Sequence, residues 1–253
     1  MPNHISNKLT IKGTEEEINK FLDFIKSDEE VDGERCHMDF NKIVPMPKEL
    51  QTSESSSRVT YALICYAMLS DDPKVKAHLP NMIGMPFDPI RERVSEKSAE
   101  EQKELFELGK QYYGYYEKYG AVDWYQWSRM HWGTKWNAYS SHLETHGNYA
   151  ELFFQTAWSG VSELMSQLTK QFPQLSFEYK YADEDISYNT GYGETDDEGD
   201  LMMNYPQGGS AEAMEIYIEC WEEDEDDWVF HEGCWQRKEW IEDEEEENEE
   251  VES

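Results

Sequence analysis

The sequence contains few cysteines and no long apolar run. Its four cysteines lie far apart and form no Cys-x-x-Cys pair, so the ligand spacing of a zinc or iron–sulfur site is missing. We interpret them as reduced, mostly buried thiols: Cys36, Cys65, Cys220 and Cys234. No stretch approaches the ~20 apolar residues of a membrane helix, and the first residues lack the basic-then-apolar pattern of a secretory signal. These absences predict a cytoplasmic protein with no metal, no cofactor and no membrane partner.

Positive charge is also scarce. The 253 residues include 22 Lys or Arg against 55 Asp or Glu, a net charge of −33. Residues 183–253 hold 28 of the acidic residues and only two basic ones, a net charge of −26, whereas the first 182 residues sum to −7. Such a surface repels phosphate backbones, so direct nucleic-acid binding is not expected.

Catalytic motifs are missing too. The sequence has no Gly-x-Ser-x-Gly, no glycine-rich phosphate loop and no kinase signature. Cys65 lies in an apolar run and Cys36 in an alternating segment, which predicts shielded thiols with little reactivity. We assign no catalytic residue and expect a protein that is not an enzyme.

Two segments weakly resemble metal sites. Asp183, Asp185, Ser187 and Glu194 have the spacing of a calcium loop, but Tyr188 stands where that loop needs glycine, so we interpret a solvated acidic loop. His142 and His146 lie four apart with Glu144 between them, and on a helix they could present two imidazoles to one metal, but Ser140-Ser141 before them and Gly147-Asn148 after them are typical of turns. We interpret these histidines as surface residues.

Hydrophobic periodicity indicates two strand–helix–strand units. The first comprises an alternating strand over 5–11, a helix over 14–25 that begins with the capping box of Thr14 and Glu17, and a strand over 36–40. The second comprises a strand over 150–158, a helix over 159–172 and a strand over 175–181. This repetition predicts an α+β, ferredoxin-like antiparallel sheet with its helices on one face.

Other segments surround these units. A helical insertion is predicted between them at about residues 54–135. One of its helices begins after the capping box of Ser98 and Glu101 and carries a tyrosine stripe that we interpret as a packing face. A further strand is predicted over 214–220. We therefore expect a ferredoxin-like domain over residues 1–221 and an acidic, aromatic-containing tail over 222–253, disordered after about residue 242.

Four stretches carry a family resemblance: Pro2 to Asn7, Phe40 to Pro47 with Glu49-Leu50 after it, Trp132 to Ala138, and Trp158 to Pro173. Over roughly residues 2–185 the chain resembles the YubB-like family of plasmid and phage proteins, named for a ferredoxin-like domain and otherwise of unknown function. The resemblance implies the fold and an origin in a mobile genetic element. The tail from Glu222 onward is not part of it.

Two groups of residues are candidate sites. The first is an acidic partner-binding surface: Glu222, Glu223, Asp224, Glu225, Asp226, Asp227, Trp228 and Trp235. Its tryptophans are costly to expose, which suggests that part of the tail docks on the body or on another protein. The second is a ligand groove, although asparagines at such positions equally brace turns: Asn41, Lys42, Trp136 and Asn137.

Three functions remain open at this stage. The first is a non-enzymatic acidic binding protein that imitates nucleic acid and blocks a basic host defence protein, one that binds DNA or RNA. The second is a small-molecule or nucleotide-binding module on the ferredoxin-like sheet. The third is an RNA-binding sheet, for which the charge is unfavourable.

Overall fold

A computed structural model describes residues 3–30, 35–83 and 87–241. The chain divides into two compact units. The sheet unit comprises Met1–Pro45 and His131–Ser253, and the helical unit comprises Met46–Met130. None of the helices in the described part of the chain combines the length and the apolar character needed to cross a membrane.

The sheet unit is built on six antiparallel strands in the order β2-β3-β1-β4-β5-β6. The strands are β1 His4–Lys12, β2 Tyr139–Thr145, β3 Tyr149–Ala157, β4 Ser176–Asp183, β5 Thr190–Thr195 and β6 Leu201–Asn204. With α1 (Glu15–Ile25) and α8 (Ser162–Thr169), the first four follow the chain order β-α-β-β-α-β of a ferredoxin-like fold. The predicted α+β, ferredoxin-like class is confirmed.

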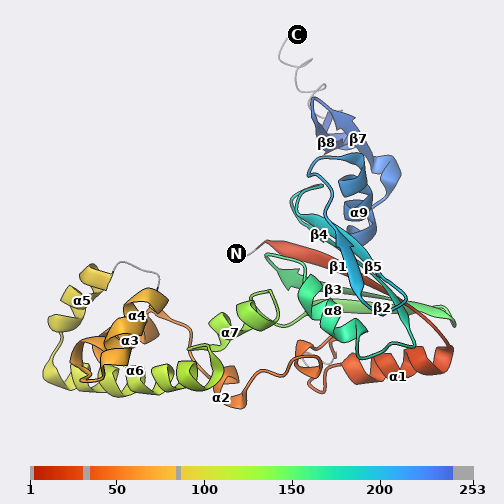
Figure 1. The fold of residues 1–253 in the computed structure, drawn as a ribbon. Helices are drawn as coiled ribbons and strands as arrows, with labels where there is room; N and C mark the ends of the chain where they lie inside the picture. Colours follow the sequence, from red (N-terminus) through yellow and green to blue (C-terminus); the bar gives the residue numbers. More distant parts are fainter. Residues whose placement is uncertain (1–2, 31–34, 84–86, 242–253) are drawn as a thin grey trace, which may run out of the picture. The chain divides into compact units, whose positions relative to one another are not determined.

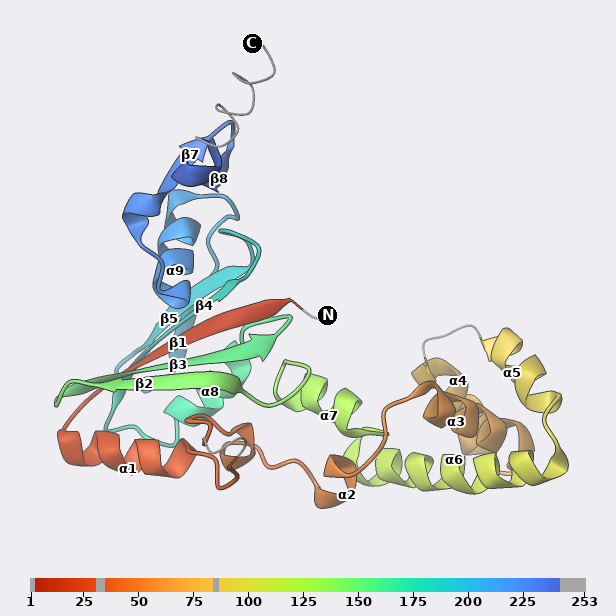
Figure 2. The same ribbon diagram turned by 180° about the vertical axis from the view of Figure 1, so that it is seen from behind.

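The two faces of this sheet are covered differently (Figures 1 and 2). Because strand side chains alternate, Asn7 of β1 points to the face that carries α1 and α8, where the hydroxyl of Tyr179 links it to the start of α8. Ser6 points to the other face and donates to the Cys220 carbonyl of α9 (Ala211–Trp221) at 2.5 Å. The two helices of the strand–helix–strand units share one face as predicted, whereas α9, whose segment was predicted as a strand, packs on the opposite face.

Helix α9 occupies the segment predicted as a strand over 214–220. Ser210 caps it by accepting from the Ala213 amide, and the buried residues recur every three or four positions: Ala213, Met214, Ile216, Tyr217 and Cys220. The alternation seen in the sequence included Ile218, which is only partly buried. The strand prediction is wrong because a run this rich in apolar residues fits both the two-residue period of a strand and the 3.6-residue period of a helix.

The strand predicted over 36–40 is also wrong. Asp39 accepts from the Asn41 amide and starts a short 3-10 helix, η1 (Phe40–Lys42). The second strand of the fold is instead β2, which follows the helical unit and pairs with β3. The insertion therefore lies inside the first strand–helix–strand unit, not between the two units.

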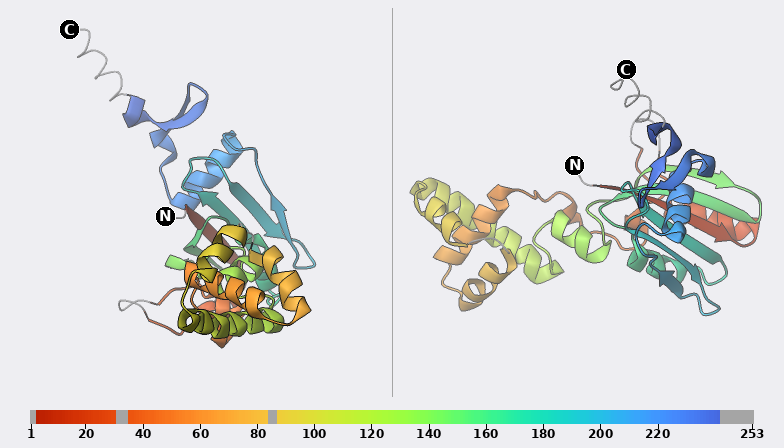
Figure 3. Two further views of the ribbon diagram at one scale, coloured as in Figure 1. Left: turned by 90° about the vertical axis from the view of Figure 1, so that its left-hand side faces the viewer. Right: turned by 90° about the horizontal axis from the view of Figure 1, so that it is seen from above.

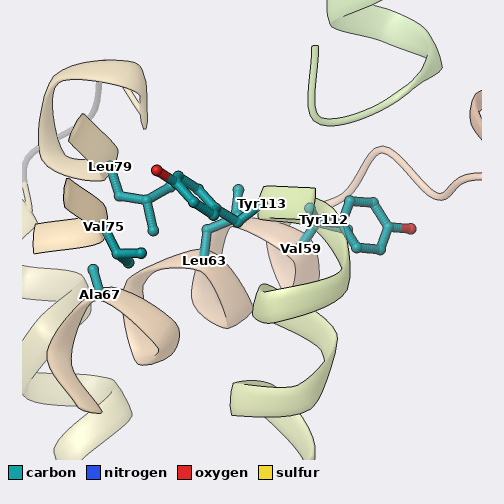
Figure 4. Close-up of a cluster of buried hydrophobic side chains, with 7 residues drawn as sticks. All are labelled: Val59, Leu63, Ala67, Val75, Leu79, Tyr112 and Tyr113. Atoms are coloured by element: carbon teal, nitrogen blue, oxygen red, sulfur yellow. The ribbon is translucent and has the colours of Figure 1, made fainter. Parts of the chain in front are cut away.

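The helical unit contains six helices in its described residues: α2 Lys48–Gln51, α3 Ser57–Leu69, α4 Pro73–Ile83, α5 Phe87–Ser95, α6 Ala99–Tyr119 and α7 Trp124–His131, the last crossing its boundary by one residue (Figure 3). The predicted capping box of Ser98 and Glu101 starts α6. Tyr112 and Tyr113 of α6 pack with Val59 and Leu63 of α3 and with Leu79 of α4 in the core (Figure 4). The interpretation of the tyrosine stripe as a packing face is confirmed for these two residues.

The segment after α9 is folded as far as it is described. It forms a 3-10 helix, η2 (Glu225–Asp227), and a two-stranded hairpin of β7 (Trp228–His231) and β8 (Cys234–Arg237). Trp228 and Trp235 pack against α9 in one hydrophobic cluster. Residues 242–253, for which disorder is predicted, lie outside the described residues.

Candidate functional site: the acidic face of helix α9

Helix α9 presents a row of carboxylates to solvent. Glu212, Glu215 and Glu219 are exposed and recur at three- and four-residue spacing, opposite the buried side of the helix. Neighbours at this spacing lie about 5–6 Å apart on a helix. The row therefore has a fixed direction and a regular separation.

The row continues beyond the end of α9. Glu222 adopts a left-handed conformation (φ 54°) that ends the helix, and the Asp224 side chain then accepts from the Asp226 amide at 3.0 Å to start η2. We call the combined surface the acidic face: Glu212, Glu215, Glu219, Glu222, Asp224, Glu225, Asp226 and Asp227. Its five residues from Glu222 onward belong to the predicted partner surface. The three glutamates of α9 were missed because 214–220 was interpreted as a strand.

Buried aromatic residues anchor this face. Trp228 is 6% exposed and meets Tyr217 edge to face, with ring centroids 5.6 Å apart. The indole of Trp235 donates to the Gly209 carbonyl at 3.2 Å. Arg237 lies over the Trp228 ring and forms an ion pair with Glu223. Of the predicted partner residues, Trp228 is therefore a core residue, and Trp235 and Glu223 help to hold the hairpin.

A network of ion pairs ties Glu219 to the sheet. The Lys180 amine lies 2.8 Å from both carboxylate oxygens of Glu219, and Lys8 lies 3.6 Å from one of them. Partial burial acts to lower the pKa of both lysines, but their carboxylate partners outweigh it and raise each pKa above its usual value. Glu219 is thus ion-paired with two lysines that also pair with Glu151 and Glu178. Among the described residues, Glu212 and Glu215 are the α9 glutamates that have no lysine or arginine partner.

Charge is divided unevenly between the two units. The helical unit contains 11 Lys or Arg and 13 Asp or Glu, a net charge of −2. The sheet unit contains 11 Lys or Arg and 42 Asp or Glu, a net charge of −31. The acidity of the protein is therefore a property of the sheet unit.

The polar residues of the predicted ligand groove make hydrogen bonds and an ion pair within the chain. The Asn137 side chain donates to Asp39 at 2.7 Å and accepts from the Phe40 amide at 2.8 Å, and Asn41 donates to the same Asp39 oxygen. Lys42 pairs with Asp28 at 2.5 Å, whereas Trp136 lies against the amine of Lys135. The structure therefore brings Asn41 and Asn137 together at the Asp39 carboxylate, where both side chains fix the segment between α1 and η1.

The two segments set aside as metal sites also have defined positions. Asp183 is buried and accepts from the side chains of Asn3 and Asn189. His142 lies on β2, stacks on Phe153 with centroids 4.5 Å apart, and reaches Glu222 at 3.2 Å. The turn expected around His142 is therefore a strand, and the acidic face contacts it.

Comparison with known proteins gives one family match. Residues 132–231 match the family described as a ferredoxin-like domain in Api92-like protein. This part of the chain resembles the Api92-like domain. The crystal structure of a protein api92 from Yersinia pseudotuberculosis matches with a TM-score of 0.39 and 10% identity, over 83% of this chain and 100% of that chain. No curated protein matches.

The Api92-like segment runs from Trp132, just before β2, to the end of β7. It contains all of α9, η2 and the Trp228 anchor, so the whole acidic face lies within it. The sequence resemblance had ended near residue 185, before α9. The acidic face therefore lies within the segment that matches this family model.

Proposed function

We propose that this protein is a non-enzymatic binding protein whose acidic face occupies the basic, nucleic-acid-binding surface of another protein. The observation that carries the proposal is the row of outward glutamates on α9, continued by η2, on a unit of net charge −31. In this view the protein imitates nucleic acid.

Rigid presentation of charge supports this proposal. In double-stranded nucleic acid, each strand presents one phosphate per ~3.4 Å of helix axis to a basic channel that binds it. The glutamates of α9, at about 5–6 Å, have a spacing of the same order. They are held by a helix whose other side is buried by Tyr217 and Trp228, so little ordering entropy is lost on binding.

The proposed target is a host defence protein that binds DNA or RNA. A YubB-like origin in a plasmid or phage would supply the biological use, and action in the cytoplasm would follow from it. Long-range attraction between opposite charges would speed the encounter and make it sensitive to salt.

The test compares two variants that change charge equally. The face variant carries Glu215→Gln, Glu222→Gln and Glu225→Gln on the acidic face. The control variant carries Glu15→Gln, Asp23→Asn and Glu163→Gln, exposed positions on α1 and α8 across the sheet. These changes spare Trp228, whereas truncation after Cys220 would remove part of the core.

The immobilised protein and both variants are incubated with host lysate, and retained proteins are eluted with double-stranded DNA or with RNA. We expect a nucleic-acid-binding protein that is retained by the wild type and the control variant, released by DNA or RNA, and lost from the face variant. Equal retention by all three, or a retained protein that nucleic acid does not release, would contradict the proposal.

A second candidate function rests on the helical unit. A cavity of about 480 Å³ there, of small-ligand size, has three cations and two carboxylates in its lining, together with Tyr61 and Leu105. Lys97 is paired with Glu101, so the cations that carry this alternative are Arg58 and Arg93. Binding of a small anionic molecule would use this cavity and not the sheet. RNA binding on the sheet has less support, because α9 packs on β1, β4 and β5 across the face such modules use.

A further inference from the structure

The β2–β3 hairpin brings three metal-ligating side chains together. Glu144 lies on β2, His146 follows its end, and Glu151 lies on β3. Gly147, with φ of 78°, starts the two-residue turn that the His146 amide closes by donating to the Tyr149 carbonyl at 2.9 Å. The turn therefore folds Glu151 back beside residues that precede it by five and seven positions.

The distances suit a small cation. The Nε2 atom of His146 lies 3.6 Å from Glu144 Oε2 and 3.9 Å from Glu151 Oε2. Bonds of ~2.0–2.2 Å from zinc to nitrogen and oxygen put tetrahedral ligand atoms about 3.4 Å apart. Shifts of a few tenths of an ångström would bring each carboxylate oxygen to that separation from the imidazole nitrogen, and the three ligand atoms already lie within 4.8 Å of one another.

Strand register supplies an independent reason for a cation here. Glu144 and Glu151 are direct partners across the antiparallel pair, and like charges in this position destabilise a sheet. Lys8 lies 2.9 Å from the Oε1 atom of Glu151, and Oε2 is the oxygen that lies toward the imidazole. Within the described residues, Glu144 has no lysine or arginine partner.

The imidazole is held in place for the same role. The His146 ring stacks on Tyr149, with centroids 4.5 Å apart and planes at 18°. With a metal bound, Glu151 would keep its ion pair with Lys8 through the other oxygen, as the supporting partners of metal ligands commonly do.

We propose that Glu144, His146 and Glu151 bind one divalent first-row transition ion of the zinc type. Two carboxylate oxygens and one imidazole nitrogen leave a fourth position open. The imidazole favours zinc and its neighbours over Mg²⁺ and Ca²⁺, which prefer oxygen ligands. The sequence pattern concealed this site because Glu151, its third member, is joined to the others only by strand pairing.

The test is calorimetric titration of the untagged full chain with Zn²⁺ in a large excess of Mg²⁺, which occupies non-specific carboxylates. We expect one zinc ion to bind per chain. His146→Ala should lower the zinc affinity at least ~10-fold, because removing even a residue that only supports a metal ligand commonly lowers affinity by that factor. Glu144→Gln should act in the same direction. His142→Ala is the control, because His142 lies on β2 four residues before His146 but pairs with Glu222.

Circular dichroism without metal separates binding from folding, since His146→Ala should retain the wild-type spectrum. Zinc affinity that is unchanged in His146→Ala, that falls equally in His142→Ala, or that disappears in excess Mg²⁺ would overturn the proposal.

Discussion

At the scale of single residues, a hydrogen-bond chain crosses the core of the sheet unit. The Val161 amide donates to the Tyr179 hydroxyl at 2.8 Å, and that hydroxyl donates to Asn7 Oδ1 at 2.7 Å. The side-chain nitrogen of Asn7, Nδ2, donates to Thr156 Oγ1 at 3.0 Å. Asn7 and Tyr179 are fully buried, and burial raises the pKa of Tyr179 well above its usual value. The hydroxyl is therefore a neutral structural link between two strands and α8.

Tyr179→Phe is expected to destabilise the protein by about 1–3 kcal/mol, because it leaves the Val161 amide and the Asn7 oxygen buried without partners. Tyr181→Phe is the matched control. Burial raises the pKa of Tyr181 to about 12, but its hydroxyl has no protein partner among the described residues. Urea denaturation of both variants provides the comparison, and equal stabilities would refute the role of the chain.

At the scale of elements, α3 and α6 approach each other closely at Gly109. A Cβ at Gly109 of α6 would lie 2.1 Å from the Ala62 carbonyl oxygen of α3, so only glycine permits this approach. Gly114, one and a half turns further along α6, has open space around the same position. The two glycines therefore have different roles in one helix.

Gly109→Ala should destabilise the helical unit by about 1–3 kcal/mol, the usual cost of overpacking. Gly114→Ala should instead stabilise it by about 0.5–1 kcal/mol, because alanine is the better helix former. Thermal unfolding followed by circular dichroism measures both. A Gly109→Ala variant as stable as the wild type would show that the helices can separate at no cost.

The helices show which structural features a local sequence pattern can predict and which it cannot. The capping boxes of Thr14 with Glu17 and of Ser98 with Glu101 allowed two helix starts to be predicted, because each involves residues three apart in sequence. The segment from Met214 to Cys220 fits the hydrophobic period of a strand and that of a helix, and its packing on β4 and β5 favours the helix. The outer glutamates of the candidate site could be recognised only after that choice.

At the scale of the molecule, the net charge of −33 repels itself. Raising NaCl from ~0.01 M to ~0.15 M shortens the screening length from ~30 Å to ~8 Å. The urea midpoint of the wild type should therefore rise over this range, and that of the face variant should rise less. A urea midpoint that does not change with NaCl concentration would show that the acidic residues are too far apart to interact. Urea is used as the denaturant because it is uncharged and does not itself screen charge.

The sequence by itself determined the α+β class, the strands at 5–11, 150–158 and 175–181 within one residue or two of their ends, and the acidic excess, since these depend on short-range periodicity and composition. Only the tertiary structure decided that β2 lies after the helical unit, that α9 is a helix, and that Glu144, His146 and Glu151 meet. Each of these depends on strand pairing or packing between distant residues, whose free energy no local pattern contains.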